Sequence, residues 1–272
     1  MGSDILRRNY FANLIKYMKN VYHIDEKFNK FEDGRVNPTY KTKHVLLPLL
    51  FGLLLRIDSL NKLKYLLKDN EFKKLFPKGT NMSSIDTVRD TLKVLDMNGP
   101  YLTNKSIIKK AARNKVFDSG TIDGYTVGAI DGTKFFGSYK KSCSQCLTTT
   151  IKGEPYYYHS GSVMSIIGDG PKLVVDYEPY NPKTNSKDKD EGEINASKRL
   201  LKRVMKDHKS LIDVVVYNAL VCNSTWINQC LALDIDTVVG VKNNNNKSLR
   251  EVKNLQTNRN LKRYGMVRKT IL

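Results

Sequence analysis

The chain has 272 residues, 40% of them hydrophobic, so it can bury one substantial core or two smaller ones. Its 46 lysines and arginines exceed its 27 acidic residues, and the resulting net charge of +19 makes a nucleic acid a more natural partner than an acidic protein. An even spread of lysines would give the same charge without forming a binding surface, so charge alone leaves both interpretations open.

Nothing in the sequence indicates a membrane protein or a secreted one. The most apolar stretch, residues 45–55 (VLLPLLFGLLL), is shorter than the roughly 20 residues that cross a bilayer, and it is predicted to be a buried helix. The first ten residues reach charge at once and no apolar run follows them, which predicts a cytoplasmic protein. Its four cysteines are then expected to stay reduced.

Residues 1–117 are predicted to form a basic, all-α domain, because apolar residues recur there at intervals of three and four. Ser59 is a candidate N-cap for one helix, and the segment Ser83–Asp86 starts a second. Asn98, Gly99 and Pro100 are expected to stop that second helix. The basic helices suit contact with DNA, although no helix-turn-helix motif is clear enough to name its reading residues.

The pattern changes near Asp118, after which short apolar runs bounded by Gly, Asp and Asn predict a sheet. Strands are expected over residues 125–130, 156–167, 172–178, 212–217 and 237–241, and helices over about 193–206 and 225–233. Three consecutive strands followed by α/β crossover units predict that residues 118–242 form a mixed sheet with flanking helices.

Two further segments are polar. Residues 180–193 carry charges of both signs and no large aliphatic side chain, so a solvated, mobile loop is expected there. Residues 243–272 are polar and basic and are interpreted as the start of an inserted region or as a truncated tail. On this interpretation the C-terminal part of the α/β core is missing from the chain.

Two predicted strands end in side chains that could serve a reaction. Asp131 ends an apolar strand beside Gly132, so its carboxylate could hold a divalent metal ion while a phosphate comes close. An ordinary Asp-Gly turn would give the same pattern. Asn218 follows a similar strand and could lie beside Asp131, although it is an amide. Asp213 begins that strand and lies at the wrong end to substitute, and Asp176 is a weaker alternative.

Several segments taken in order resemble the DDE-type insertion-sequence transposases over about residues 41–242. They are SSIDTVRDTL, AIDGT, YYYHSGSVMSIIG, GE with ASKRLL, VVVYNALVCNSTWINQCL and VVGVK. The resemblance implies the N-terminal part of such a transposase, with a ribonuclease-H-like core. It also implies DNA transposition, in which DNA phosphodiesters at element ends and target are cut and joined with Mg²⁺ or Mn²⁺, and self-association of transposase copies.

In this family three acids bind two divalent ions, and the resemblance assigns two of those positions here. Asp131 matches the first acid and Asn218 occupies the position of the second. The third, a glutamate in a Tyr-Arg-Glu-Lys type motif on a later helix, has no match before Leu272. A unit charge about 4 Å from another is worth roughly 4 kcal/mol at an effective dielectric near 20, so weak metal binding and little or no strand cleavage are expected.

Further charged residues lie in and before the helix predicted at 193–206. Its candidate phosphate contacts are Lys198, Arg199 and Lys202. A solvated helix face explains these three residues equally well. Glu191 and Glu193 are interpreted as loop and capping acids rather than catalysts.

A zinc site is a weaker candidate. Cys143 and Cys146 have zinc-like spacing, but no second pair is equally convincing, so reduced structural thiols are favoured. His159 occupies what resembles a motif position of the family's second strand, and a hydrogen-bonded core histidine is favoured over a metal ligand. No Gly-rich phosphate loop is present, so nucleotide binding is not expected.

The leading hypothesis is therefore a truncated, catalytically impaired transposase polypeptide. The alternative is a non-catalytic DNA-binding or inhibitory transposase fragment, which the missing third glutamate favours for the isolated chain. A cellular ribonuclease-H-like nuclease would need a complete acid cluster within these residues, and the sequence offers none.

Overall fold

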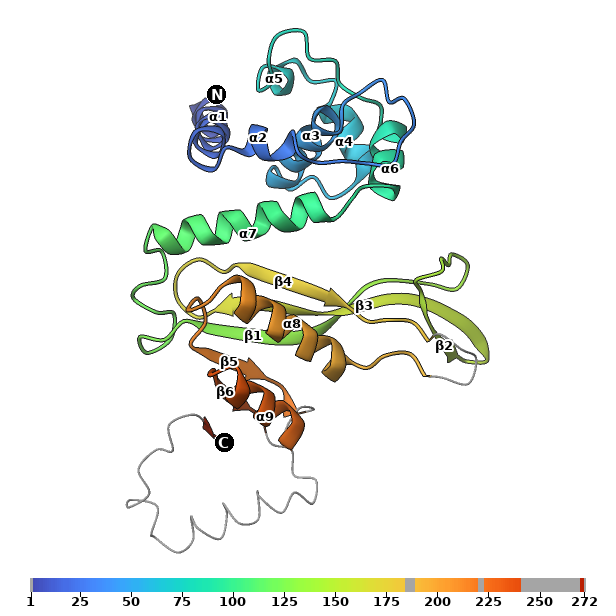
Figure 1. The fold of residues 1–272 in the computed structure, drawn as a ribbon. Helices are drawn as coiled ribbons and strands as arrows, with labels where there is room; N and C mark the ends of the chain where they lie inside the picture. Colours follow the sequence, from blue (N-terminus) through green and yellow to red (C-terminus); the bar gives the residue numbers. More distant parts are fainter. Residues whose placement is uncertain (1, 184–188, 220–222, 241–269, 272) are drawn as a thin grey trace, which may run out of the picture. The chain divides into compact units, whose positions relative to one another are not determined.

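The computed structural model describes residues 2–183, 189–219, 223–240 and 270–271 (Figure 1). The chain divides into two compact units, residues 1–110 and residues 111–272, which are called here the helical unit and the sheet unit. The predicted boundary, at residue 117, lies a few residues later. Within the described ranges, no helix combines the length and the apolar character that crossing a bilayer requires.

The helical unit is built around one apolar helix. Its helices are α1 (Gly2–Tyr22), α2 (Ile24–Phe28), α3 (Thr42–Leu54), α4 (Leu60–Leu66), α5 (Asn70–Lys73), α6 (Ile85–Lys93) and α7 (Asn98–Arg113). The stretch predicted as a buried helix forms most of α3, and its Phe51 is completely buried. The rings of Phe11 and Phe76 lie against Phe51, with centroids 6.5 and 5.2 Å away. Aromatic and aliphatic packing around α3 therefore forms the core of this unit.

Both predicted helix starts are confirmed by N-cap hydrogen bonds. The Ser59 hydroxyl accepts from Lys62 N at 3.3 Å, and the Ser84 hydroxyl accepts from Thr87 N at 3.1 Å. The segment beginning at Asn98 does more than stop a helix, because it forms the first turn of α7. A proline is tolerated there because first-turn N–H groups have no intrahelical partner.

The sheet unit is a mixed α/β structure, as predicted. Its elements are β1 (Val127–Ser138), β2 (Leu147–Ile151), β3 (Glu154–Ile167), β4 (Val174–Pro179), α8 (Glu193–Asp207), β5 (Val214–Tyr217), α9 (Ser224–Ala232), β6 (Asp236–Val239) and β7 (Thr270–Ile271). Within the described residues, these strands form one sheet in the order β2-β3-β1-β5-β6-β7, with β4 also paired to β3. Most of the predicted tail, residues 243–272, lies outside the described residues.

The first strands differ most from the prediction. β1 continues eight residues beyond the predicted end, and β2 was not predicted at all. From Asp131 onward β1 is mostly exposed, so it carries no regular alternation of buried and exposed side chains. Its extension is held by antiparallel pairing with β3, which continues as far as Ser138 opposite Tyr157. A strand that is exposed on both faces shows no hydrophobic alternation by which the sequence could identify it.

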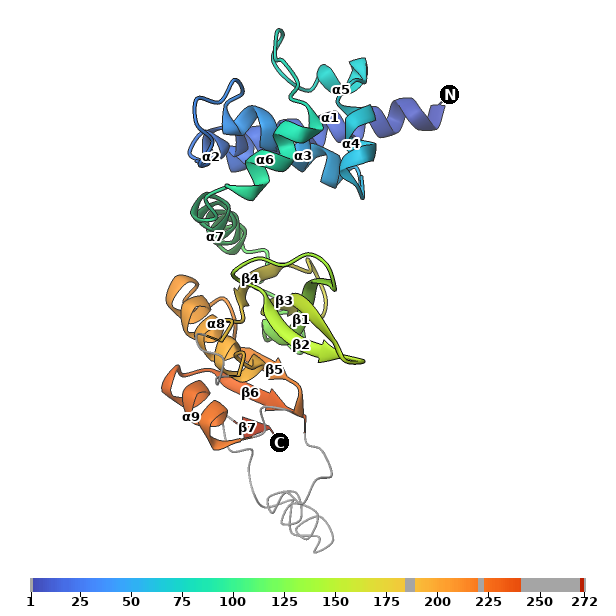
Figure 2. The ribbon, with the colours of Figure 1, turned by 90° about the vertical axis from the view of Figure 1, so that its right-hand side faces the viewer.

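The two crossover helices cover the same face of the sheet (Figure 2). β1 runs antiparallel to β3 and parallel to β5, and β5 runs parallel to β6. Tyr217 at the end of β5 contacts both helices: its hydroxyl bonds Ser197 of α8 and its ring meets Trp226 of α9 edge-on at 4.9 Å. Trp226 is fully buried and donates from Nε1 to Thr237 Oγ1 at 3.2 Å. This core fixes the strand ends beside it.

Candidate functional site

Asp131 and Asn218 lie level with each other on the neighbouring strands β1 and β5. Contrary to the prediction, Asp131 does not end its strand, because β1 continues to Ser138, whereas Asn218 directly follows β5. The parallel strands β1 and β5 place Ala129 opposite Val216, and each of the two polar residues stands two positions further along its strand. Parallel neighbours are about 4.8 Å apart, so the two side chains leave the sheet at the same edge. Both residues are exposed, and Gly132 N donates to Asp131 Oδ1 at 3.0 Å.

A carboxylate that the sequence did not assign to the site, Glu193, joins this pair. Asn218 Nδ2 donates to Glu193 Oε1 at 3.4 Å. A Cβ atom on Gly132 would lie only 2.6 Å from Glu193 Oε2, so the carboxylate sits where a side chain at position 132 would stand. Glu193 does occupy the first turn of α8, as its interpretation as a capping acid requires, but its carboxylate also reaches the strand ends.

The hydroxyl of Tyr180 lies close to the same acidic side chains. Burial raises the pKa of Tyr180, and the negative charges of Glu193, Asp131 and Glu191 raise it further. A Cβ atom on Gly132 would also lie 2.6 Å from the Tyr180 hydroxyl. The edge of the sheet therefore carries acidic side chains gathered around one phenol, an arrangement suited to a cation.

Two arginines of α8 are committed to ion pairs within the sheet unit. Arg199 Nε donates to Glu178 Oε1 at 2.7 Å, and its Nη2 donates to Glu191 Oε2 at 2.8 Å. Arg203 Nε donates to Asp176 Oδ2 at 2.7 Å. The pairing with Arg199 lowers the pKa of Glu191. Asp176 is thus a buried ion-pair partner and lies outside the acid group at the strand ends.

The other predicted residues fall into different surroundings. Lys198 Nζ donates to Thr225 Oγ1 at 2.9 Å, while Lys202 is exposed. Asp213 lies at the opposite end of β5, as expected, where its carboxylate accepts from Thr126 N at 2.8 Å.

The predicted loop at residues 180–193 is anchored at its later end. Asp190 accepts from Thr148 N at 2.7 Å and from Lys183 N at 2.9 Å. Residues 184–188, at the centre of the expected loop, lie outside the described residues. The anchored end leads directly into Glu193 and so helps to place its carboxylate.

The helical unit carries an open groove of about 650 Å³ beside α4, α5 and the start of α6. Its basic lining residues, all exposed, are Lys64, Lys68, Lys73 and Arg89. Lysine and arginine side chains around a groove suit a phosphate backbone. One acid, Asp86, also lines the groove, and it pairs with Arg89 at 2.6 Å.

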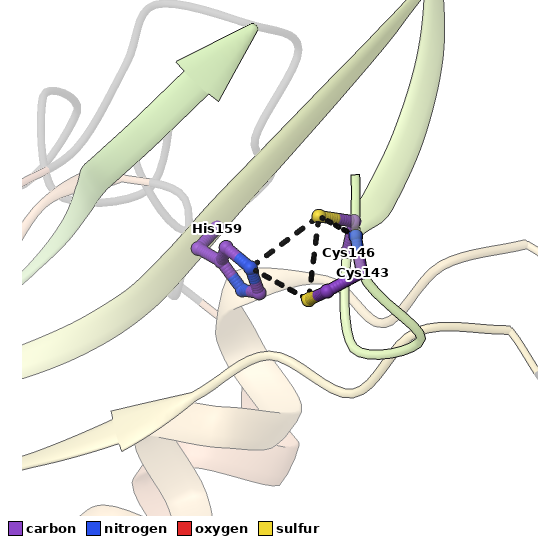
Figure 3. A group of neighbouring side chains, drawn as sticks. All are labelled: Cys143, Cys146 and His159. Carbon is purple, nitrogen blue, oxygen red and sulfur yellow. Dashed lines mark hydrogen bonds between the residues drawn. The ribbon is translucent and has the colours of Figure 1, made fainter. Parts of the chain in front are cut away.

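The structure also brings together Cys143, Cys146 and His159 (Figure 3). In the sequence, the cysteine pair and the histidine are separate candidates. His159 is hydrogen-bonded, as favoured, but its partners are the two sulfur atoms and the side chain is only half-buried. The zinc-like spacing therefore has a third potential ligand supplied by the neighbouring strand.

Comparisons with known proteins assign no family. No family model matches the chain, and no curated protein matches it. Among solved structures, the piggyBac transposase in a synaptic complex with hairpin DNA aligns with 89% of this chain at 13% identity and a TM-score of 0.41. The chain spans 52% of that protein. A likeness at this level is too distant to assign either a fold or a function.

Proposed function

We propose that this chain is a transposase-type DNA-processing protein whose metal site consists of Asp131, Glu193 and Asn218. One observation carries the proposal: Asp131 on β1 is level with Asn218, which directly follows β5, and the Glu193 carboxylate meets Asn218 at 3.4 Å. The motifs that resemble DDE-type transposases supply the chemistry, since Asp131 and Asn218 occupy two of that family's acid positions. Glu193 is an addition from the geometry.

The order of the strands supports a ribonuclease-H-like core. Three antiparallel strands, β1, β3 and β4, precede two parallel strands that are reached through α8 and α9. The site lies at the carboxyl end of β5, where β5 stops pairing with β1, and the carboxyl ends of parallel strands are the common location of binding sites in α/β sheets.

The residues at this edge fit Mg²⁺ or Mn²⁺ in ligand type, because both ions favour oxygen ligands. Asp131 and Glu193 would hold the ion through carboxylates, and Asn218 would offer its amide oxygen. Such an ion, when bound, activates water or a DNA 3′ hydroxyl and stabilises the leaving oxygen. Two negative charges stand where the family has three, so we propose that ion binding is weak and strand cleavage slow.

DNA is the proposed partner, together with a second copy of the chain. The net charge of +19 and the basic groove of the helical unit support contact with phosphates. Lys198 and Lys202 on α8 are further proposed contacts, since α8 begins at the acid group. Arg199 would have to exchange its ion pairs with Glu178 and Glu191 to join them.

Nicking of supercoiled plasmid DNA in the presence of Mn²⁺ tests this function without knowledge of the element ends. The unchanged chain should nick slowly, Asn218→Asp should nick faster, and Asp131→Ala in the Asn218→Asp background should remove that gain. The last variant also controls for contaminating nuclease, because it differs at one exposed side chain.

The alternative function is that of a non-catalytic DNA-binding or inhibitory fragment. The amide at position 218 favours it, because Asn218 adds no negative charge for an ion and donates a hydrogen bond to Glu193. Retarded migration of DNA by all three proteins, with no nicking by any of them, would support this alternative and contradict a cleaving site.

A further inference from the structure

Three potential metal ligands meet at the far end of the long β1–β3 pair (Figure 3). Cys143 and Cys146 lie between β1 and β2, and His159 lies on β3. Their ligand atoms all lie within 4.8 Å of one another. Two sulfur atoms and an imidazole nitrogen form a soft ligand set, which differs in kind from the oxygen ligands at Asp131.

The distances within this group match the edges of a tetrahedral zinc site. Zinc lies about 2.3 Å from sulfur and about 2.0 Å from histidine nitrogen, so a tetrahedron requires a sulfur–sulfur edge of about 3.8 Å and sulfur–nitrogen edges of about 3.5 Å. The Sγ atoms of Cys143 and Cys146 are 3.7 Å apart, and His159 Nε2 lies 3.4 and 3.3 Å from them. A disulfide would hold the sulfur atoms about 2.05 Å apart.

The hairpin formed by β2 and β3 creates this geometry. Its two-residue turn consists of Lys152 and Gly153, both with positive φ (52° and 83°), as a tight hairpin turn requires. The register pairs Leu147 with Tyr158, so the next positions outward, Cys146 and His159, stand opposite each other. The third ligand thus comes from strand pairing rather than from a sequence motif.

A local turn brings the second sulfur to the first. Cys146 N donates to Cys143 O at 3.1 Å, and Cys143 N donates to Cys146 Sγ at 3.3 Å. These two bonds close the turn that holds the two sulfur atoms 3.7 Å apart. Cys146 is buried and Cys143 is exposed, so the group opens to solvent on one side.

We propose that Cys143, Cys146 and His159 bind one Zn²⁺ ion, with water as the fourth ligand on the exposed side. Two thiolates balance the charge of the ion, and binding releases the protons of the two thiols. Bound there, the ion would tie the segment between β1 and β2 to β3. Close by, Lys134 Nζ lies 5.0 Å from the ring centroids of both Tyr156 and Tyr158. The bound ion would also hold these three side chains in place.

This site is separate from the acid group. His159 pairs with Phe136, which is five residues beyond Asp131 on β1, or roughly 16 Å at about 3.3 Å per residue. Zinc binding can therefore be tested independently of DNA cleavage.

The full chain, purified without a metal-binding tag, should contain close to one zinc per molecule by plasma mass spectrometry. Co²⁺ in place of zinc should give the intense absorption of tetrahedral thiolate coordination. Cys143→Ser, Cys146→Ser and His159→Asn should each weaken zinc binding by more than roughly 100-fold, the upper limit for losing a mere hydrogen-bond partner of a ligand. Cys230→Ala, which removes a thiol on α9, is the matched control and should keep the metal.

Folding is monitored in each variant by the fluorescence of Trp226, the single tryptophan of the chain. Cys143 is exposed, so Cys143→Ser gives a folded test protein even where changes at buried Cys146 do not. A reduced, folded chain that fails to take zinc from a weak chelator overturns the proposal. Unchanged zinc content in Cys143→Ser, or octahedral Co²⁺ spectra, overturns it equally.

Discussion

The side-chain amide of Asn218 donates a hydrogen bond to the Glu193 carboxylate, joining the end of β5 to the first turn of α8 at 3.4 Å. An aspartate at position 218 would place a second negative charge at that distance, and two carboxylates tolerate such proximity only with a cation or a shared proton between them. The amide therefore makes the strand end stable without an ion. Asparagine at position 218 therefore removes the need for an ion, whereas aspartate at the same position would create it.

The position of Glu193 depends on the missing side chain at Gly132. Gly132→Ala would place a Cβ atom 2.6 Å from both Glu193 Oε2 and the Tyr180 hydroxyl, and these flexible groups must move away. In the Asn218→Asp background, we expect Mn²⁺ affinity to fall about tenfold, which corresponds to about 1.4 kcal/mol. Isothermal titration of Mn²⁺ measures this change.

Gly192→Ala is the control for that experiment, because a Cβ atom at position 192 meets no other atom within 4 Å. It should leave Mn²⁺ affinity unchanged. Equal losses in the two alanine variants would mean that Glu193 is not the group displaced.

Reversal of charge in the basic groove should weaken DNA binding in a salt-dependent manner. Lys64→Glu combined with Lys68→Glu removes two cations that line the groove. If both contact phosphates, the slope of log affinity against log salt concentration should fall in magnitude by about 1.8, or about 0.9 per phosphate. Fluorescence anisotropy of labelled duplex DNA over a salt series measures the slope.

The matched control carries the same change of net charge elsewhere on the helical unit. Lys62 and Lys74 are exposed and paired with Asp58 and Glu71, each at 2.7 Å, and neither lysine lines the groove. If the control pair of glutamate substitutions reduces the slope as much as the groove pair, binding depends on overall charge and not on this groove.

A buried ion pair in the helical unit should stabilise it above acidic pH. Arg35 donates to the Asp33 carboxylate from Nε at 2.8 Å and Thr42 donates from its hydroxyl at 2.6 Å, while the Asp33 side chain is only 2% exposed. Hydrogen bonds from Arg35, opposed by burial and helped by Thr42, lower the pKa of Asp33 from 3.8 to about 2. The charged form is therefore worth about 2 kcal/mol to folding.

Because the folded pKa lies below the unfolded value, this stability is present above about pH 4 and is lost as the pH falls through about 2. Asp33→Asn should lower the free energy of unfolding by about 2 kcal/mol at pH 7, seen by circular dichroism. Trp226 fluorescence, which reports only on the sheet unit, should not change. Equal stability of variant and unchanged chain at pH 7 would show that the pair contributes nothing.

Features fixed by neighbouring residues were predictable from the sequence. Ser59 and Ser84 cap helices through bonds to backbone N–H groups three residues away, so neighbouring residues in the sequence are enough to predict their role. The helices α8 and α9 fall within one residue of their predicted ends because one face of each is apolar and buried. The mixed sheet was predictable from the order of the elements, in which three consecutive strands precede alternating helices and strands.

Features fixed by strand pairing were not predictable in the same way. Glu193 reads locally as a capping acid, and its partner Asn218 lies 25 residues away across the sheet. Likewise, Cys146 meets His159 only because of the β2–β3 hairpin, whose first strand is largely exposed and shows no hydrophobic alternation. The signal that could have located this hairpin is the Lys152-Gly153 pair between two β-forming segments.

The most direct test of the proposed metal site is the affinity of Mn²⁺ for the unchanged chain and for Asn218→Asp, measured by electron paramagnetic resonance of free and bound Mn²⁺. A third carboxylate beside Asp131 and Glu193 should raise the affinity at least tenfold, since about 1.4 kcal/mol is a modest part of the roughly 4 kcal/mol available to a charge at about 4 Å. Asp131→Ala in that background should abolish the gain, while Asp213→Asn, at the other end of β5, should preserve it. Equal Mn²⁺ affinity with asparagine and aspartate at position 218 would contradict the account, because Asp131, Glu193 and residue 218 would then not form a metal site.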